Sequence, residues 1–158
     1  MNVNIICIGS LKEKYLIDAV NEYKKRLTRY CKFEIIELSE ERITDQETDA
    51  LIDKTIKKEG EKILSKIGKS DYVIAMCIEG KQLSSEDLSK KLSDISMSSG
   101  TVDFIIGGSW GLCDDVKRRA DFKLSVSKMT FPHQLFRVML SEQIYRAFSI
   151  SANAKYHK

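Results

Sequence analysis

The residue types best suited to chemistry gather in one stretch, SKMTFPHQLFR at 127–137. It holds the single proline of the chain, Pro132, and one of its two histidines, His133. Pro132 keeps Phe131 extended and is tolerated at a helix start, where its missing N–H costs no hydrogen bond. His133 then falls in the first helical turn, where the helix dipole disfavours imidazolium. We expect a neutral, hydrogen-bonding imidazole; a histidine that caps or packs is the alternative.

A second loop with suitable chemistry is IIGGSWGL at 105–112. Its glycines at 107, 108 and 111 permit positive φ and let a ligand such as an adenosine approach bare backbone. The loop is neither a G-x-G-x-x-G fingerprint after a first strand nor a P-loop, since it lacks G-K-[ST]. A tight strand-to-helix turn is the alternative. The equivalent loop one strand earlier, MCIEGKQLSS at 76–85, is interpreted as a plain turn before a capped helix.

The patterns of most hydrolases are missing from the sequence. It has no G-x-S-x-G elbow, no metal-ligand cluster and no carboxylate pair in a candidate loop. A reaction that needs mainly the alignment of two bound partners remains. Methyl transfer from S-adenosylmethionine is of that kind, because the sulfonium supplies the reactivity.

Alternating strand and helix patterns must position these loops. Apolar runs predict strands at 3–9, 32–38, 71–80, 101–108 and 122–127. Helical spacing of apolar residues predicts helices at 11–30, 51–67, 84–95, near 113–120 and at 133–150. Strands that are apolar on both faces specify a mostly parallel sheet covered on both sides, so we expect one α/β domain over 1–158. Ligands bind at the carboxyl ends of such strands, which are the loops after Ile78, Ile106 and Val126.

The last predicted helix is apolar nearly all round. One stripe contains Leu135, Val138 and Met139, and another contains Phe136, Leu140, Ile144, Ala147 and Phe148. A surface helix shows one stripe, so two stripes predict that one packs on the sheet and the other on a second subunit. Burial of both stripes within a monomer is the alternative.

Charge is unevenly placed along the chain, whose net charge is +3. From Val116 onward nine Lys or Arg residues face two Asp or Glu residues, whereas ELSEERITDQETD at 37–49 is acidic. A polyanion would be attracted to the C-terminal third and repelled from 37–49, which indicates nucleic acid. An ordinary solvated surface is the alternative.

Composition indicates a soluble cytosolic protein. The content is 42% hydrophobic and 31% charged, and the chain shows no signal-peptide pattern and no apolar run of the ~20 residues that span a bilayer. The four cysteines form no C-x-x-C and have no histidine nearby in sequence. We therefore expect buried free thiols in a reducing compartment.

IIGGSWGL, LSVSKMTFPHQLFRVMLSEQIYRAFSI and the terminal YHK resemble the ribosomal RNA large subunit methyltransferase H family, within the SPOUT superfamily. The similarity runs the length of the chain and includes GSLKEKY and KEGEKIL. It implies a deep trefoil knot in the C-terminal half, a cytoplasmic homodimer and bound S-adenosylmethionine. It also implies methylation of N3 of a pseudouridine in helix 69 of 23S rRNA, on the assembled ribosome. The knot follows from the resemblance alone, because chain threading is rare.

The resemblance also assigns residues to the cofactor. It implies that 126–131 wraps the cofactor, that the glycine loop faces it and that Met76 closes the adenine side. The implied cofactor-binding residues are Met76, Gly107, Gly108, Val126, Ser127, Lys128, Met129, Thr130 and Phe131. Pro132 and His133 mark the point where the loop leaves the cofactor and the interface helix starts.

The terminal tail is implied to lie near the cofactor pocket of the partner subunit. Tyr156, His157 and Arg137 are then candidates for gripping RNA or assisting loss of the N3 proton. A base could take that proton, since the imide is weakly acidic, but a preorganised positive environment could suffice.

Two positions depart from the family pattern. Relatives often have His-Pro in place of Ala154-Lys155, and this difference concerns residues implied to contact RNA. Trp110 stands where smaller or polar residues are common, and it could stack on a base or pack under the helix.

Three other functions are compatible with parts of the pattern. A superfamily enzyme acting on another RNA such as a tRNA is disfavoured by the small size of the chain. A non-catalytic ribosome-binding protein would keep the cofactor pocket as a scaffold. A flavodoxin-like regulator fits the α/β alternation but not the C-terminal block.

Overall fold

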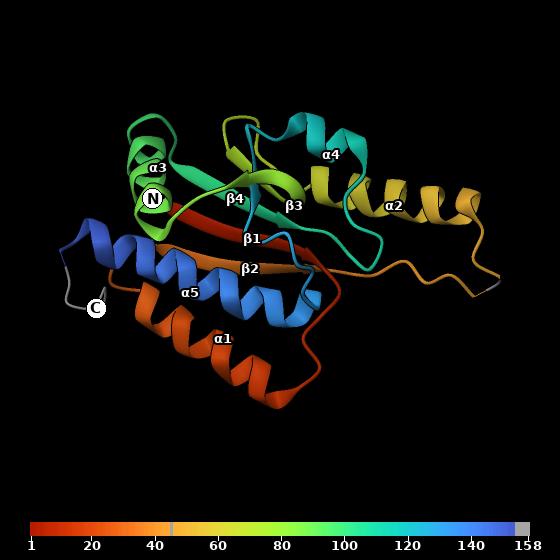
Figure 1. The fold of residues 1–158 in the computed structure, drawn as a ribbon, viewed down its shortest axis with the longest axis horizontal. Coiled ribbons are helices and arrows are strands. Elements are labelled where there is room, and N and C mark those ends of the chain that lie inside the picture. Colours follow the sequence, from red (N-terminus) through yellow and green to blue (C-terminus); the bar gives the residue numbers. More distant parts are fainter. Residues whose placement is uncertain (45, 154–158) are drawn as a thin grey trace.

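The structure is a computed structural model that describes residues 1–44 and 46–153. Within these residues the strands are β1 Asn2–Ile8, β2 Lys32–Leu38, β3 Tyr72–Gln82, β4 Thr101–Ile106 and β5 Phe122–Ser125 (Figure 1). The helices are α1 Lys14–Leu27, α2 Asp49–Leu64, α3 Ser85–Ser98, α4 Asp114–Arg119 and α5 His133–Ser151. Every predicted element is confirmed, with small displacements of its ends.

The strands form one parallel sheet in the order β2-β1-β4-β3-β5. β4 lies at its centre, and β1 beside it pairs with β2 and β4, so that Asn2 is opposite Lys32 and Thr101. The predicted parallel sheet is therefore confirmed, and the carboxyl ends of all five strands meet at one edge.

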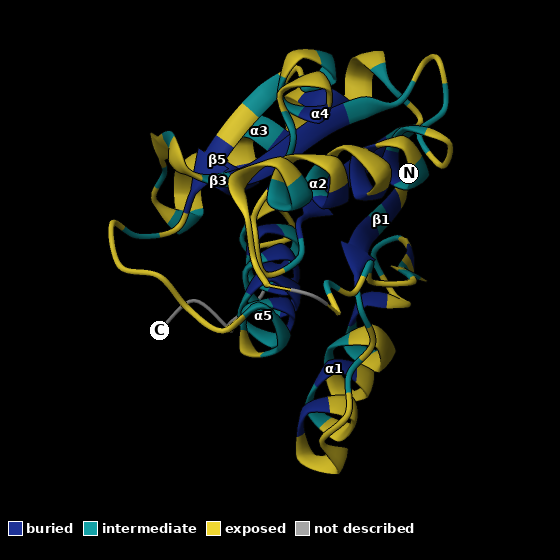
Figure 2. Ribbon diagram, turned by 90° about the vertical axis from the view of Figure 1, so that its right-hand side faces the viewer, coloured by how far each residue is buried: buried dark blue, intermediate teal, exposed yellow. Residues whose placement is uncertain are grey.

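Helices cover both faces of the sheet, as predicted. α1, α3 and α5 pack on one face, and their buried residues form a core with the strand residues that point to that side. α2 and α4 cover the other face through Ile63 and Val116, which pack with Ile6, Ile105 and Ala75. Figure 2 shows the buried strands between these two helical layers.

Helix starts follow the local sequence. The Ser84 hydroxyl accepts from the Asp87 N–H at 3.0 Å, and the Asp87 carboxylate accepts from the Ser84 N–H, a capping box that begins α3. Thr48 caps α2 in the same way by accepting from the Leu51 N–H. Pro132 stands at the N-cap of α5, so the predicted helix start at His133 is confirmed.

α5 lies between α1 and α3 and is the most enclosed helix of the described chain. Leu140, Ile144 and Ala147 are fully buried against the sheet, which confirms the packing of one predicted stripe. The other stripe differs, because Leu135 is 41% exposed and Val138 and Met139 line a groove beside α3. A second apolar surface therefore remains on this helix.

All four cysteines are free thiols, as predicted. Cys7 is buried in β1, but Cys31, Cys77 and Cys113 are only half-buried. The expectation of burial is wrong for Cys77 because β3 leaves the sheet register directly after Met76. No helix within residues 1–44 and 46–153 is long and apolar enough to cross a membrane.

Candidate functional site

The loops that follow β3, β4 and β5 enclose a cavity at the carboxyl edge of the sheet. We call it the glycine-loop cavity. Its lining includes the following residues predicted to bind the cofactor: Met76, Gly107, Gly108, Val126, Ser127, Met129, Thr130 and Phe131. Lys128 is exposed and is not among the lining residues. The cavity volume is about 170 Å³, below the ~300 Å³ of a typical complete ligand site. Its lining residues Ile78, Val126 and Met129 are more than a third exposed, so one side of the site is open.

A bulge in β3 opens the first side of this cavity. Met76 and Lys81 both pair with Leu124, so the residues between them project out of the sheet. A Cβ at Gly80 would lie 2.6 Å from the Leu124 carbonyl carbon, so only glycine fits where the bulged strand returns to β5. Glu79, at the tip, forms an ion pair with Lys117 of α4 at 2.6 Å, which ties the bulge to the opposite layer. The sequence interpretation of a plain turn missed this bulge.

The glycine loop forms the second side through backbone contacts. The Gly111 N–H donates to the Gly108 carbonyl at 3.1 Å and closes a tight turn. A Cβ at Gly107 would lie 2.4 Å from the Gly111 carbonyl oxygen, so the turn requires glycine there. At Gly111 φ is +83°, and an added Cβ would meet no protein atom within 4 Å. This backbone is therefore accessible from the cavity.

The segment after β5 forms the third side and is held by its own serines. The Ser125 hydroxyl donates to the Ser127 carbonyl at 2.9 Å, and the Ser127 hydroxyl accepts from the Met129 N–H at 3.0 Å. These bonds hold the chain in a turn without a helix or strand. Met129 is 71% exposed and Phe131 is 36% exposed, so the segment presents apolar side chains.

Several lining residues were missed by sequence reasoning. They are Cys77, Leu112, Leu124, Ser125 and Phe136, whereas Ile78, Ile106, Gly111 and His133, to which the sequence had pointed, also line the cavity. Most of the missed residues adjoin predicted loop positions at the strand ends, which is the signal that could have found them.

Glu59 of α2 is a further residue that sequence reasoning missed. Its side chain is almost fully buried beneath Gly108, where a Cβ would lie 2.9 Å from Glu59 Oε2. Oε1 accepts from the Glu41 N–H at 3.0 Å, whereas Oε2 has no hydrogen-bond partner among the described residues. Burial raises the pKa of this carboxyl, and the bond from Glu41 opposes the shift. Its position on the α2 face that carries Gly60 and Ile63 was the available signal.

Arg137 is fully buried, with its guanidinium turned into the protein. Nη2 donates to the carbonyls of Ile8 at 2.7 Å and Gly9 at 3.0 Å, and Nη1 forms an ion pair with Glu37 at 2.9 Å. Nε has no partner among the described residues. The guanidinium therefore holds the turn after β1, and none of its N–H groups is exposed to solvent.

A second hollow, the polar cleft, borders the glycine-loop cavity. Its walls are the turn at 9–12, the segment 37–42 and the first residues of α5, and its volume is about 620 Å³. His133 lines both hollows, whereas Ser109 of the glycine loop lines only the polar cleft. The start of α5 at His133 therefore lies at the border between the glycine-loop cavity and the polar cleft.

The remaining predicted positions have separate outcomes. Tyr156, His157 and the pair Ala154-Lys155 lie outside the described residues. Trp110 is 38% exposed and is not a lining residue of either hollow. Within 1–44 and 46–153 no group of three His, Cys, Asp or Glu side chains is arranged to hold a metal ion.

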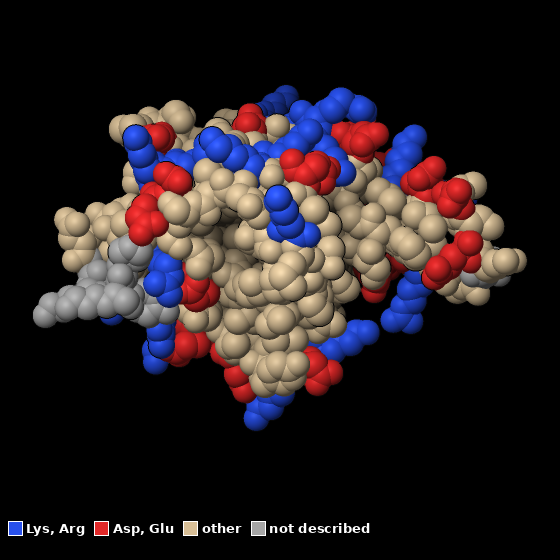
Figure 3. Space-filling view, viewed as in Figure 1, with Lys and Arg blue, Asp and Glu red and all other residues tan. Residues whose placement is uncertain are grey.

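Much of the positive charge of the C-terminal third is already paired. Lys117, Arg118, Arg119, Arg137 and Arg146 each form an ion pair. The sequence count therefore overstates the positive charge that this region offers to a polyanion. Figure 3 shows Lys and Arg interleaved with Asp and Glu around a largely uncharged area above α5.

Comparison with known families defines the class. Residues 1–157 match the family described as "Predicted SPOUT methyltransferase". The fold is also similar to that of a probable methylase family protein from Haemophilus influenzae Rd KW20, at a TM-score of 0.57 and 13% identity over 99% of this chain and 70% of that one. The fold and the sequence together define a SPOUT methyltransferase.

Curated relatives narrow the class. The chain is 56% identical to the ribosomal RNA large subunit methyltransferase H of Clostridium acetobutylicum, with both chains covered completely. It is 49% identical to the protein of that name from Streptococcus uberis, again over both complete chains. It belongs to the ribosomal RNA large subunit methyltransferase H family.

Proposed function

We propose that this protein transfers the methyl group of S-adenosylmethionine to N3 of a pseudouridine in helix 69 of 23S rRNA, acting in the cytoplasm on the assembled ribosome. The observation that carries the proposal is the glycine-loop cavity in a chain with full-length similarity to proteins named as ribosomal RNA large subunit methyltransferases. We propose that 1–158 forms one domain whose site a second copy of the chain completes.

The lining of the cavity fits S-adenosylmethionine. An adenosine needs apolar walls and backbone polar groups at close range, and both are present. Met76, Leu124 and Phe131 supply apolar surface, and the backbone at Gly107 and Gly111 is free of side chains. Val126, Ser127, Met129 and Thr130 close the third side, and Lys128 stays at its rim as a candidate contact. When bound, the cofactor supplies an electrophilic methyl on its sulfonium.

The protein has to align the acceptor nitrogen and accommodate loss of its proton. Methyl transfer forms the N3–CH₃ bond, breaks the S–CH₃ bond and releases the N3 proton. Tyr156 and His157 of the tail are our candidates beside the acceptor, either as the group that takes the proton or as donors that favour the N3 anion. Arg137 is proposed as a positioning residue, because its guanidinium holds the turn after β1.

We propose a homodimer through α5, with the chain knotted in its C-terminal half. Support for the dimer comes from apolar surface that the monomer leaves uncovered: Ile78, Val126, Met129, Phe131 and Leu135 are all more than a third exposed. They adjoin the glycine-loop cavity and the start of α5. A partner placed there would cover this surface and close the open wall of the site.

The test is methyl transfer from labelled S-adenosylmethionine to ribosomes from cells that lack this modification. Assembled ribosomes, free 23S rRNA and tRNA are compared, and the labelled nucleotide is identified by mass spectrometry. We expect label in 3-methylpseudouridine on assembled ribosomes alone. Cofactor binding without any label would instead indicate a non-catalytic ribosome-binding protein.

His157→Ala separates the two ways of losing the proton. A rate that falls by ~10²-fold or more agrees with a general base. Methylation that persists near the original rate excludes His157 as an obligate base and leaves the positive environment as the explanation.

A further inference from the structure

The polar cleft has no role in the function proposed above. It opens at the carboxyl ends of β1 and β2 and adjoins the glycine-loop cavity at His133. Its volume of about 620 Å³ lies within the ~300–1,000 Å³ of small-ligand sites. It is therefore large enough for a nucleotide beside the proposed cofactor.

Two cations line the cleft without a counter-ion. Lys12, on the turn after β1, and Arg42, on the loop after β2, are both exposed lining residues. Neither has an ion-pair partner among residues 1–44 and 46–153. Both are therefore available for an anion, unlike the paired arginines of α4.

The acidic side chains nearby are already neutralised or hydrogen-bonded. Glu37 is paired with Arg137 at 2.9 Å, and Glu41 is paired with Lys62 at 2.5 Å. The Glu40 carboxylate accepts from the Ser109 hydroxyl at 3.3 Å. The 37–42 part of the acidic segment, expected from sequence to repel a polyanion, thus presents Arg42 beside carboxylates that already have partners.

The cleft has a frame of hydrogen bonds between its walls. Glu37 Oε1 accepts from the Leu11 N–H at 3.0 Å as well as from Arg137, and the Lys12 N–H donates to Gln134 Oε1 at 3.2 Å. The turn that carries Lys12 is therefore fastened to β2 and to α5. A turn that is already held in place loses less conformational entropy when a ligand binds to it.

We infer that the polar cleft takes the RNA nucleotide that is to be methylated, with Lys12 and Arg42 contacting its flanking phosphates and its base directed past His133 toward the glycine-loop cavity. This inference rests on the proposed function. An extruded base needs a polar pocket beside the methyl donor, and backbone phosphates need unpaired cations. The cleft combines both features at the border of the cavity.

The test compares the double variant Lys12→Gln, Arg42→Gln with the wild type. Ribosome affinity is measured over a series of salt concentrations. Each lost phosphate contact lowers the slope of log affinity against log salt by roughly 0.7–0.9, so we expect a reduction of about 1.5. We also expect the KM for ribosomes to rise about tenfold, with kcat and the Kd for S-adenosylmethionine unchanged.

The matched control is Lys57→Gln, Lys69→Gln. It removes two exposed cations that lie away from the cleft and have no ion-pair partner in the part of the chain that the structure describes. Its slope should stay at the wild-type value. Equal slopes for the two double variants would overturn the inference, and so would lost cofactor affinity with an unchanged slope, because the cations would then serve the cofactor.

Failure of the proposed function gives a different pattern. If the wild type binds ribosomes but transfers no methyl group, the proposed function is overturned. A reduced salt slope in the cleft variant would still support an RNA site in the polar cleft. A wild type that neither binds nor methylates ribosomes overturns both proposals. If the wild type methylates ribosomes and the cleft variant behaves like the wild type, only the inference about the polar cleft is overturned.

Discussion

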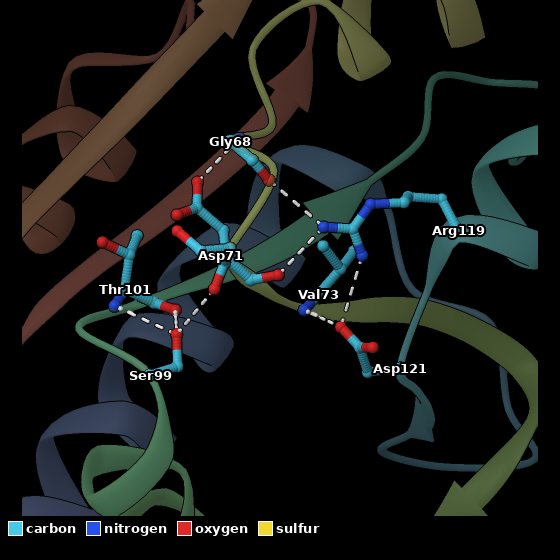
Figure 4. A network of polar contacts seen from close by, with 8 residues as sticks. Gly68, Asp71, Val73, Ser99, Thr101, Arg119 and Asp121 are labelled. Carbon is cyan, nitrogen blue, oxygen red and sulfur yellow. Dashed lines mark hydrogen bonds and ion pairs between the residues drawn. The ribbon is translucent and has the colours of Figure 1, made fainter.

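The two edges of the sheet are built in opposite ways. At the amino edge, polar side chains fasten neighbouring segments to one another, as Figure 4 shows for the loops around Asp71, Ser99 and Arg119. At the carboxyl edge, the loops around the glycine-loop cavity leave backbone and apolar side chains uncovered. One parallel sheet thus carries a fastened edge and an open edge.

Arg119 is the centre of the fastened edge. Its Nη2 donates to the carbonyls of Asp71 at 3.0 Å and Gly68 at 3.2 Å, and Nη1 forms an ion pair with Asp121 at 3.4 Å. Asp121 in turn accepts from the Val73 N–H at 2.8 Å (Figure 4). These bonds satisfy backbone groups at the start of β3 and join it to the end of α4.

At the open edge, the loops around the glycine-loop cavity are held mainly by hydrogen bonds within each loop. The turn at Gly108 and Gly111 and the serine turn after β5 are each closed on themselves. Facing them, the cavity lining stays free for a ligand. The difference teaches that polar ties between segments hold the amino edge and the polar cleft, whereas the glycine-loop cavity has few of them, and therefore that stability and cofactor binding respond to different substitutions.

The largest expected effect comes from Gly107→Ala at the open edge. Its Cβ would meet the Gly111 carbonyl at 2.4 Å, which forces the turn and the cavity wall to shift. We expect the Kd for S-adenosylmethionine to rise at least ~100-fold, about 2.7 kcal/mol, measured by calorimetry. Gly100→Ala is the control, because its Cβ would meet nothing within 4 Å. Similar affinities in the two variants would contradict the assignment of the cavity.

Arg119→Ala tests the fastened edge and should lower stability without touching the site. It leaves two carbonyls without this donor and removes the ion-pair partner of Asp121, so we expect a loss of about 2 kcal/mol in the free energy of unfolding. The neighbouring Arg118→Ala breaks only an exposed ion pair with Asp115 and should change stability by less than about 0.5 kcal/mol. Urea titration measures both. An altered cofactor Kd in Arg119→Ala would show that the two edges are coupled.

Sequence patterns predicted the elements of both edges but not their contacts. Apolar runs locate the strands, and proline and glycine locate the loops of the open edge, because those signals depend on local backbone preference. The pairing of Arg119 with backbone at Gly68 and Asp71 joins positions about fifty residues apart, which periodicity does not register. The count of basic residues after Val116 took no account of pairing, whether local, as between Arg146 and Glu142, or distant, as between Arg137 and Glu37. Nor did the sequence separate Glu59 from exposed helical glutamates.

Asp103 gives the smallest effect and the one that depends on pH. Asp103 lies fully buried in β4, between β1 and β3. The Asn4 amide donates to its Oδ1 at 2.8 Å. Burial raises its pKa to about 6, the Asn4 bond opposes the rise and the Asp71 carboxylate adds to it.

The sign of the pH effect follows from the two pKa values. A carboxyl of the unfolded chain titrates near ~3.9, whereas folded Asp103 titrates at about 6. The folded state therefore holds the proton more tightly, and its stability advantage, present at low pH, is lost as pH rises from about 4 through 6. Asp103→Asn keeps an acceptor for Asn4 and carries no charge, so this loss disappears.

We therefore expect Asp103→Asn to unfold with about 1–2 kcal/mol more free energy than the wild type at pH 7.5, and with no gain at pH 4.5. Urea titrations at both pH values measure the difference, and Asp53→Asn, an exposed carboxyl on α2, should follow the wild type at each. A gain that is the same at both pH values would mean that the amide improves packing and that the buried charge contributes nothing. A gain confined to high pH, with cofactor affinity unchanged, would show that the buried charge of Asp103 costs stability at the fastened edge without affecting the glycine-loop cavity.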